Sequence, residues 1–215
     1  MAIIYLVRHG QTKWNREEIF RGQTDIPLND FGRLQAKALA KALEKENLKS
    51  PVLIASPLKR ATETAEIAAG HLDLASVNKD PAYLDMSYGE WEGKPLKEIK
   101  QKYPELYQTW LEHPEKAVFP GGENLKKAAD RAEEGIYRAA GNNPGGHTII
   151  FAHRAINKVL LCRLLGLGEP GFWKIRQDTA CLNELAYGSR NFILVKLNDT
   201  CHLQDIDATF GQTKS

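Results

Sequence analysis

Residues 2–12 of the chain read AIIYLVRHGQT, and the core of the protein begins there. Ala2–Val7 is a short, continuous apolar run rich in β-branched residues, which predicts a buried β-strand. An arginine, a histidine and a glycine follow where that strand ends. Ligands of open α/β sheets bind beyond the carboxyl ends of the strands, so we expect Arg8 and His9 to lie at a ligand site.

A second histidine follows an equally apolar run. Residues 147–152 predict another buried strand, and His153 comes directly after it. If the two strands are parallel neighbours, His9 and His153 emerge at the same edge of the sheet. A histidine beside a guanidinium can act as a nucleophile toward a phosphoryl group, because the guanidinium binds the anion that the imidazole attacks.

The rest of the chain alternates between strand-length and helix-length segments. Short strands are predicted at residues 52–55, 180–187 and 192–197, the last two forming a hairpin. Helices are predicted at residues 29–46, 96–111 and 124–140, and from residue 154 to a stop at residues 166–168. The helix over residues 96–111 is interrupted near Pro104. A further helix is predicted after the second strand, with Ser56 as its cap and Pro57 in its first position. This alternation predicts a three-layer α/β fold, with helices on both faces of a mostly parallel sheet.

The composition is that of a globular protein, with 42% hydrophobic and 26% charged residues among 215. Nothing that resembles a linker divides the chain, so we expect one domain over residues 1–215, with a loose tail from about residue 205. The net charge is only +2, and no dense cluster of lysine and arginine stands out. Neither a nucleic acid nor a membrane is therefore expected as a partner.

The cysteines and the N-terminus predict a cytoplasmic protein. Cys162, Cys181 and Cys201 are widely spaced and have no zinc-ligand pattern, as is typical of reduced thiols. The first residues contain no basic leader with a cleavage site, and no apolar run approaches the ~20 residues that span a bilayer.

Further short motifs stand between the two histidines. They are Asn15, Arg21-Gly22-Gln23-Thr24-Asp25 in a predicted functional loop over residues 11–27, Leu28–Gly32, Ser56–Ala61, Gly89-Glu90-Trp91-Glu92-Gly93 and Gly121-Gly122-Glu123. In this order and spacing, the sequence resembles the histidine phosphatase superfamily, in its phosphoglycerate-mutase-like branch, over about residues 3–195. The resemblance implies the phosphoglycerate mutase-like fold. It also implies a metal-independent phosphomonoesterase that needs no cofactor and acts on a small phosphorylated metabolite.

The resemblance also implies a role for each matching residue. His9 is phosphorylated during turnover, and Arg8, Arg60 and His153 complete the phosphate pocket. Asn15, Arg21, Gly22 and Gln23 are expected to bind substrate at its rim. Guanidiniums that converge on one pocket repel each other unless an anion lies among them, and a phosphoryl group matches the guanidinium fork.

Asp85 stands where the family has a glutamate, four residues before Gly89. We predict that it donates a proton to the leaving alcohol and later accepts one from the attacking water. Aspartate is shorter by one methylene, so the substrate or the backbone must approach by about 1.5 Å. Glu90 and Glu92 are nearby alternatives that the spacing disfavours, and in the remaining interpretation Asp85 is only a turn residue.

Arg154 is a second departure from the family, since many relatives have glycine after the second histidine. It lies near a predicted helix N-terminus, where the helix dipole disfavours a cation. An anion should compensate. Either Arg154 forms a salt bridge with Glu123 or another carboxylate, or it binds an acidic part of the substrate.

Hydrolysis is expected rather than transfer to a second hydroxyl. Mutases of the family carry an extended basic segment after the acid residue, and this chain leaves little room for one. A cofactor-dependent phosphoglycerate mutase is the alternative. A non-catalytic phosphoanion-binding module is a second one, although the intact Arg8, His9, Arg60 and His153 argue against it. The sequence leaves open which phosphate ester is used and whether the chain forms a homodimer.

Overall fold

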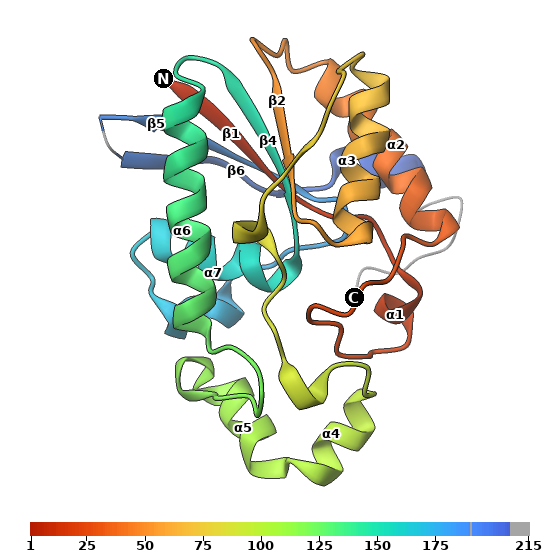
Figure 1. The fold of residues 1–215 in the computed structure, drawn as a ribbon, viewed down its shortest axis with the longest axis vertical. Helices are drawn as coiled ribbons and strands as arrows, with labels where there is room; N and C mark the ends of the chain where they lie inside the picture. The colour runs from red at the N-terminus through yellow and green to blue at the C-terminus, as the bar shows by residue number, and fades with distance from the viewer. Residues whose placement is uncertain (190, 207–215) are drawn as a thin grey trace.

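A six-stranded sheet forms the centre of the computed structural model, which describes residues 1–189 and 191–206 (Figure 1). Its order is β3-β2-β4-β1-β5-β6. The strands are β1 (Ala2–Arg8), β2 (Val52–Ala55), β3 (Asn78–Lys79), β4 (His147–Ala152), β5 (Leu182–Gly188) and β6 (Asn191–Asp199). The short β3 was not anticipated from the sequence.

The sheet is mixed, and its two apolar central strands are neighbours. β1 and β4 are parallel, with Arg8 beside Ala152. β2 is parallel to β4 and to β3, whereas β5 is antiparallel to β1 and to β6. The predicted α/β fold is confirmed, including the antiparallel closing hairpin. The segments that follow β1 and β4 therefore leave the sheet side by side.

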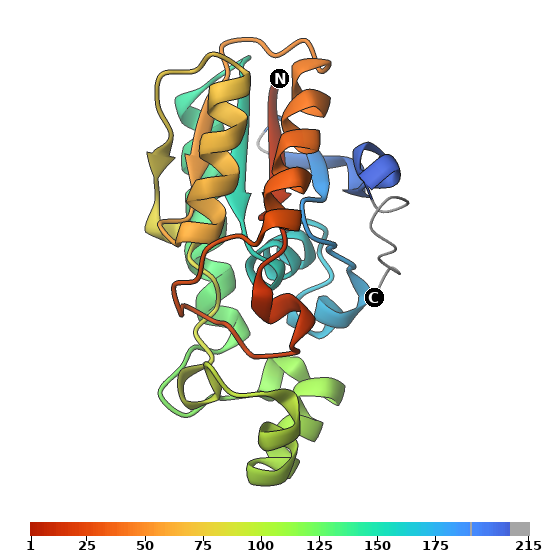
Figure 2. The same cartoon turned by 90° about the vertical axis from the view of Figure 1, so that its right-hand side faces the viewer.

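Helices cover both faces of the sheet (Figures 1 and 2). The long helices are α2 (Asp30–Glu44), α3 (Lys59–His71), α6 (Leu125–Asn142) and α7 (Arg154–Leu164). Ile4 and Leu6 of β1 belong to the core that contains α6 and α7, and Tyr5 and Val7 belong to the core with α2 and α3. Successive side chains of a strand point to opposite faces, so a strand buried on both faces is a continuous apolar run.

Three short helices lie outside these layers. α1 (Lys13–Arg16) is a single turn within the predicted functional loop, and α4 (Leu96–Lys102) and α5 (Pro104–Glu112) are the two short helices expected around Pro104. Both views show α4 and α5 beyond one end of the sheet (Figures 1 and 2). No helix among the described residues is long and apolar enough to cross a membrane. Residues 207–215, most of the predicted loose tail, lie outside the described residues.

The predicted start of the third helix is wrong by two residues. α3 begins at Lys59 with Leu58 as its N-cap, so Ser56 does not cap it and Pro57 is not its first residue. The backbone of Ser56 instead continues the pairing with β4, because its N–H donates to the carbonyl of Phe151 at 2.9 Å. The helix can begin only after this pairing ends.

Two glycines bring the start of α2 against the loop that follows β1. A β-carbon on Gly10 would lie 2.5 Å from the carbonyl oxygen of Gly32, and one on Gly32 would overlap the carbonyl of Gln11. Asn29 caps α2 by accepting from the Gly32 N–H at 2.7 Å, and its own N–H donates to the Gln11 carbonyl at 3.0 Å. The helix thus fixes the loop that begins at His9.

Candidate active site

His9 follows β1 and is almost fully buried. Its Nδ1 lies 2.6 Å from the carbonyl oxygen of Gly10. Because a carbonyl only accepts, Nδ1 carries the hydrogen and Nε2 keeps its lone pair. Burial, with the nearby Arg60 and Arg8, lowers the pKa of His9 well below its ordinary 6.5. The imidazole is therefore a neutral base with one nitrogen available as a nucleophile.

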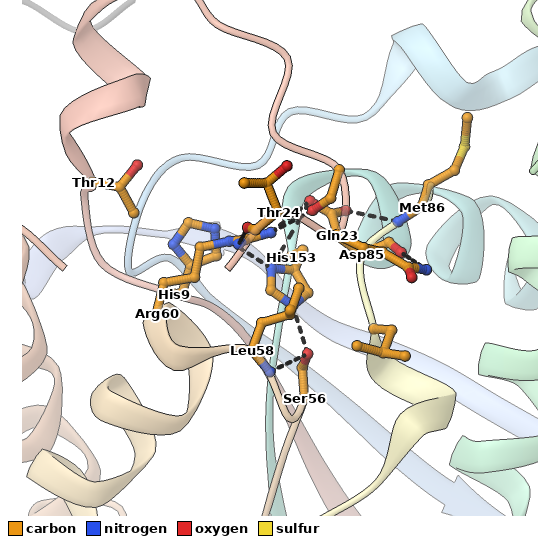
Figure 3. Close-up of polar contacts among 12 residues, drawn as sticks. His9, Thr12, Gln23, Thr24, Ser56, Leu58, Arg60, Asp85, Met86 and His153 are labelled. Atoms are coloured by element: carbon orange, nitrogen blue, oxygen red, sulfur yellow. Dashed lines mark hydrogen bonds and ion pairs between the residues drawn. The ribbon is translucent and has the colours of Figure 1, made fainter. Parts of the chain in front are cut away.

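His153 follows β4 and faces His9, with 5.2 Å between the ring centroids. Arg60 donates from Nε to Nδ1 of His153 at 3.2 Å, so that nitrogen carries no hydrogen. Nε2 of His153 then donates to the hydroxyl of Ser56 at 2.8 Å, as Figure 3 shows. Burial lowers the pKa of His153 well below 6.5, and Arg60 lowers it further. The sequence indicated Ser56 as a helix cap and not as the residue that orients this ring.

Arg60 connects His153 to the loop over residues 21–25, and its charge lies near His9. Its guanidinium is fully buried and donates to the carbonyls of Thr24 at 2.9 Å and Gly22 at 2.7 Å. Nη2 also lies 3.3 Å from Oδ2 of Asp85 (Figure 3). The loop supplies backbone carbonyls to Arg60, and these hold the guanidinium beside the imidazoles.

Arg8 and Arg21 add positive charge, and neither has a carboxylate within 4.0 Å among the described residues. Nη1 of Arg8 donates to the carbonyl of Gln177 at 2.6 Å, but its buried Nε has no hydrogen-bond partner. Burial lowers the pKa of Arg8 to about 9 and that of Arg21 to about 10. Nearby arginines lower both pKa values further: Arg21 and Arg154 act on Arg8, and Arg60 and Arg154 act on Arg21. A buried donor without a partner among mutually repelling cations indicates an anion site.

Asp85 is buried beside these cations. Its Oδ1 accepts from the N–H of Met86 at 3.0 Å, and its Oδ2 lies 3.9 Å from Nδ1 of His153. Burial raises the pKa of Asp85, and Arg60 and Arg21 oppose the rise. The side-chain amide of Gln23 donates to the Asp85 carbonyl at 3.1 Å. The carboxyl group is thus fixed in place and inclined to keep a proton.

The sequence as a whole matches a known family in the region that contains this site. Residues 4–200 match the family model of the histidine phosphatase superfamily, branch 1. The chain belongs to this superfamily. The resemblance noted from the motifs is thereby confirmed.

Named relatives of this histidine phosphatase span nearly its whole length. It is 32% identical over 203 residues to Phosphoserine phosphatase 1 of Hydrogenobacter thermophilus, covering 94% of this chain and 95% of that protein. It is 26% identical to the adenosylcobalamin/alpha-ribazole phosphatase of Escherichia coli, covering 91% and 95%. The solved structure of Bacillus stearothermophilus YhfR has a TM-score of 0.89 at 27% identity, covering 95% and 100%. The chain is a phosphatase of the histidine phosphatase type.

A cavity of about 580 Å³ brings most of the predicted residues of this histidine phosphatase together. Its wall includes Arg8, Asn15, Arg21, Gly22, Asp85 and Arg154. Much of the remaining wall is aromatic, from Phe20, Tyr88, Tyr107, Trp110, Phe172 and Trp173. Four of the predicted site residues are not among those that line it: His9, Arg60, His153 and Gln23. Oδ1 of Asn15 accepts from the N–H and the hydroxyl of Thr12, both at 2.8 Å. Asn15 therefore also holds the turn that follows the histidine loop.

The two glutamates near Asp85 are engaged elsewhere. Glu92 accepts from the N–H of Tyr88 at 2.9 Å and from the hydroxyl of Ser87 at 3.0 Å. Glu90 is exposed and accepts from the hydroxyl of Tyr103. Of the three acids considered from the sequence, only Asp85 contacts the phosphate-pocket residues.

Of the two interpretations of Arg154, the salt bridge with Glu123 is not formed. Both oxygens of Glu123 accept from Arg131 at 3.0 Å, and Arg131 also donates to the Asp85 carbonyl. Arg154 has no carboxylate within 4.0 Å among the described residues, and its guanidinium lies 6.0 Å from the ring of Trp173. The side chain is exposed on the cavity wall.

Lys158 is a cavity residue that the sequence did not single out. It lies one helical turn after Arg154 and is only 3% exposed. A charged residue between the apolar Ile156 and Val159 was the available signal.

In the described part of the chain, no group of three or more histidine, cysteine, aspartate or glutamate side chains is placed to hold a metal ion.

Proposed function

We propose that this phosphatase hydrolyses small-molecule phosphomonoesters through a phosphohistidine on His9, without a metal ion. The observation that carries the proposal is the geometry of His9: its Nδ1–H is fixed on a backbone carbonyl, and its free Nε2 lies beside the buried cations Arg8 and Arg60. Similar proteins named as phosphoserine and alpha-ribazole phosphatases support a small ester as the substrate.

In the first step, Nε2 of His9 attacks phosphorus and forms a P–N bond while the ester P–O bond breaks. The leaving oxygen takes the proton of Asp85, whose burial favours the protonated acid. The unpartnered Nε of Arg8 and the guanidinium of Arg21 are available to the phosphoryl oxygens. In phosphoryl transfer such positioning and charge stabilisation supply most of the catalysis.

In the second step, water attacks phosphorus and the P–N bond breaks. The Asp85 carboxylate accepts a proton from that water, so Asp85 is again protonated and His9 is again neutral. The products are an alcohol from the first step and inorganic phosphate from the second. Arg60 remains bonded to two backbone carbonyls and can stabilise the phosphoryl group throughout.

The experiment is a rapid quench in alkali after mixing the enzyme with a phosphate ester, followed by peptide mapping. An alkali-stable, acid-labile phosphoryl adduct on His9 is expected, and His147→Asn serves as the control because that ring bonds to Lys49 away from the site. Prior dialysis against a chelator should leave turnover unchanged. Turnover without an adduct, an adduct on another residue, or loss of activity with the chelator would each contradict the proposal.

Product analysis separates hydrolysis from phosphoglycerate mutase activity. We expect free phosphate in proportion to ester consumed, without a bisphosphoglycerate primer. An isomerised ester without phosphate release would favour the mutase. An unchanged ester that nevertheless binds would favour a phosphoanion-binding module.

A further inference from the structure

Lys158 on α7 is a buried cation in an aromatic slot. Its ammonium lies 4.5 Å from the ring centroid of Phe172 and 4.4 Å from that of Trp173, both in the 3-10 helix η4 (Glu169–Lys174). No carboxylate lies within 4.0 Å of Lys158 or of Arg154 among the described residues. Both side chains line the cavity that also contains Arg8 and Asp85. The cavity therefore has a second positive region besides the phosphate pocket.

We propose that Lys158 and Arg154, with the Trp173 ring beside them, form a subsite for the carboxylate of an acidic phosphate ester. The inference rests on the proposed function, since it assigns the second anionic group of a substrate whose phosphoryl group is transferred at His9.

The electrostatics of Lys158 favour binding of an external anion. Burial disfavours its charge, and Arg154 and Arg8 disfavour it further, so that its pKa is lowered to about 7. The two ring faces attract an ammonium group and hold it in position, but they carry no net negative charge. A bound carboxylate would supply the missing counter-charge to Lys158 and to Arg154, whose planar guanidinium suits a carboxylate.

The spacing suits a compact ester. Arg154 comes directly after His153, and Lys158 lies five residues after it. Five residues rise about 7.5 Å along a helix. A carboxylate a few bonds from the phosphoryl group can therefore reach α7 while phosphorus stays near His9. One lysine and one arginine match a single negative charge better than a second phosphate group, and the phosphate pocket has its own arginines.

The test compares two esters with the same carbon skeleton, 3-phosphoglycerate and glycerol 3-phosphate, of which only the first has a carboxylate. Lys158→Met keeps the apolar stem between the two rings and removes the charge. Loss of a charged hydrogen bond should raise the KM for 3-phosphoglycerate about tenfold to a hundredfold. The fold-change in KM for glycerol 3-phosphate should be smaller than that for 3-phosphoglycerate by a factor of about ten or more. The kcat of both esters should change little, because the contact is made equally in the bound and transition states.

Arg154→Met gives a second, independent variant at an exposed position, so it tests the subsite even if Lys158→Met does not fold. Lys174→Met is the matched control, since this exposed lysine of η4 does not line the cavity. Equal loss for both esters in the two cavity variants would show a structural role and overturn the proposal. The proposal would also be overturned if the wild-type enzyme had no lower KM for 3-phosphoglycerate than for glycerol 3-phosphate. A lower KM for glycerol bisphosphate than for 3-phosphoglycerate would overturn it too, since the second anion would then be a phosphate group.

A binding measurement separates failure of the subsite from failure of the proposed chemistry. If no ester is turned over and no His9 adduct forms, the proposed function fails. The thermal shift produced by 3-phosphoglycerate, relative to glycerol 3-phosphate, still reports the subsite. A larger shift with the acid that disappears in Lys158→Met would support the subsite, and equal shifts would overturn it.

Discussion

Replacing Asp85 with asparagine removes one transferable proton and almost nothing else. Asparagine has the same size, and its side-chain oxygen can still accept from the Met86 N–H. Arg60 loses a carboxyl partner 3.3 Å away but keeps the carbonyls of Gly22 and Thr24. The acid form of Asp85 and the asparagine side chain are both uncharged, so the charge of the phosphate pocket is the same in the two proteins. We therefore expect KM to change little.

The catalytic effect depends on the leaving group. General acid catalysis contributes about 10²–10⁴ in rate, which is about 2.7–5.4 kcal/mol at about 1.36 kcal/mol per factor of ten. Asp85 is buried and its pKa is raised, so we expect an effect near the middle of this range, about a thousandfold in kcat for an alkyl ester. An aryl phosphate with an acidic phenol leaves without a proton, so its first step should proceed at a nearly unchanged rate.

A stopped-flow assay with an aryl phosphate measures both steps in one experiment. The variant should release about one equivalent of phenolate per enzyme in a burst and then turn over slowly, because water still needs Asp85 as its base. Asp85→Glu should retain most of the activity, and Glu90→Gln should behave as wild type, since Glu90 is bonded to Tyr103 at the surface. An equal loss for alkyl and aryl esters, without a burst, would refute the assignment.

Four further predictions concern the site and the packing around it. Arg60→Lys should lower kcat/KM at least about a hundredfold, because a lysine cannot replace four directed contacts of a guanidinium. The turnover rate should hold down to mildly acidic pH, because the pKa of His9 is lowered well below 6.5. It should decline as the pH rises through the raised pKa of Asp85, and this decline should be absent in Asp85→Asn. Below pH 6.5 the unfolded chain binds more protons at His9 than the folded one, so the unfolding free energy should fall with falling pH. Gly32→Ala should cost about 1–3 kcal/mol in urea unfolding, whereas Gly70→Ala, with open space around it, should not destabilise the protein.

The sequence was sufficient for five of the six strands of the sheet and for the positions of its two histidines. β1 and β4 are buried on both faces, so each is an uninterrupted apolar run that can be recognised without knowing its partner. Parallel pairing of these strands then brings His9 and His153 together. The apolar runs of the two strands and their parallel pairing were therefore enough for this part of the prediction.

Contacts between distant segments were not predictable in the same way. Ser56 looked like a helix cap because its neighbours suit one, and only the position of His153 shows that its hydroxyl has another partner. The sequence left open a salt bridge of Arg154 with Glu123, and it does not form because Arg131 binds Glu123 from α6. Lys158 looked like one polar residue of an apolar helix until Phe172 and Trp173 were placed beside it.

The helices α4 and α5 lie beyond the sheet, apart from the strands that position the candidate catalytic residues. His9, His153 and Arg60 are held by β1, β4 and the start of α3, whereas Tyr107 and Trp110 reach the cavity from α5. With the proposed chemistry at His9, we expect divergence of α4 and α5 to change which alcohol moiety the cavity accepts. Swapping residues 96–112 between relatives is accordingly a direct route to an enzyme with altered selectivity.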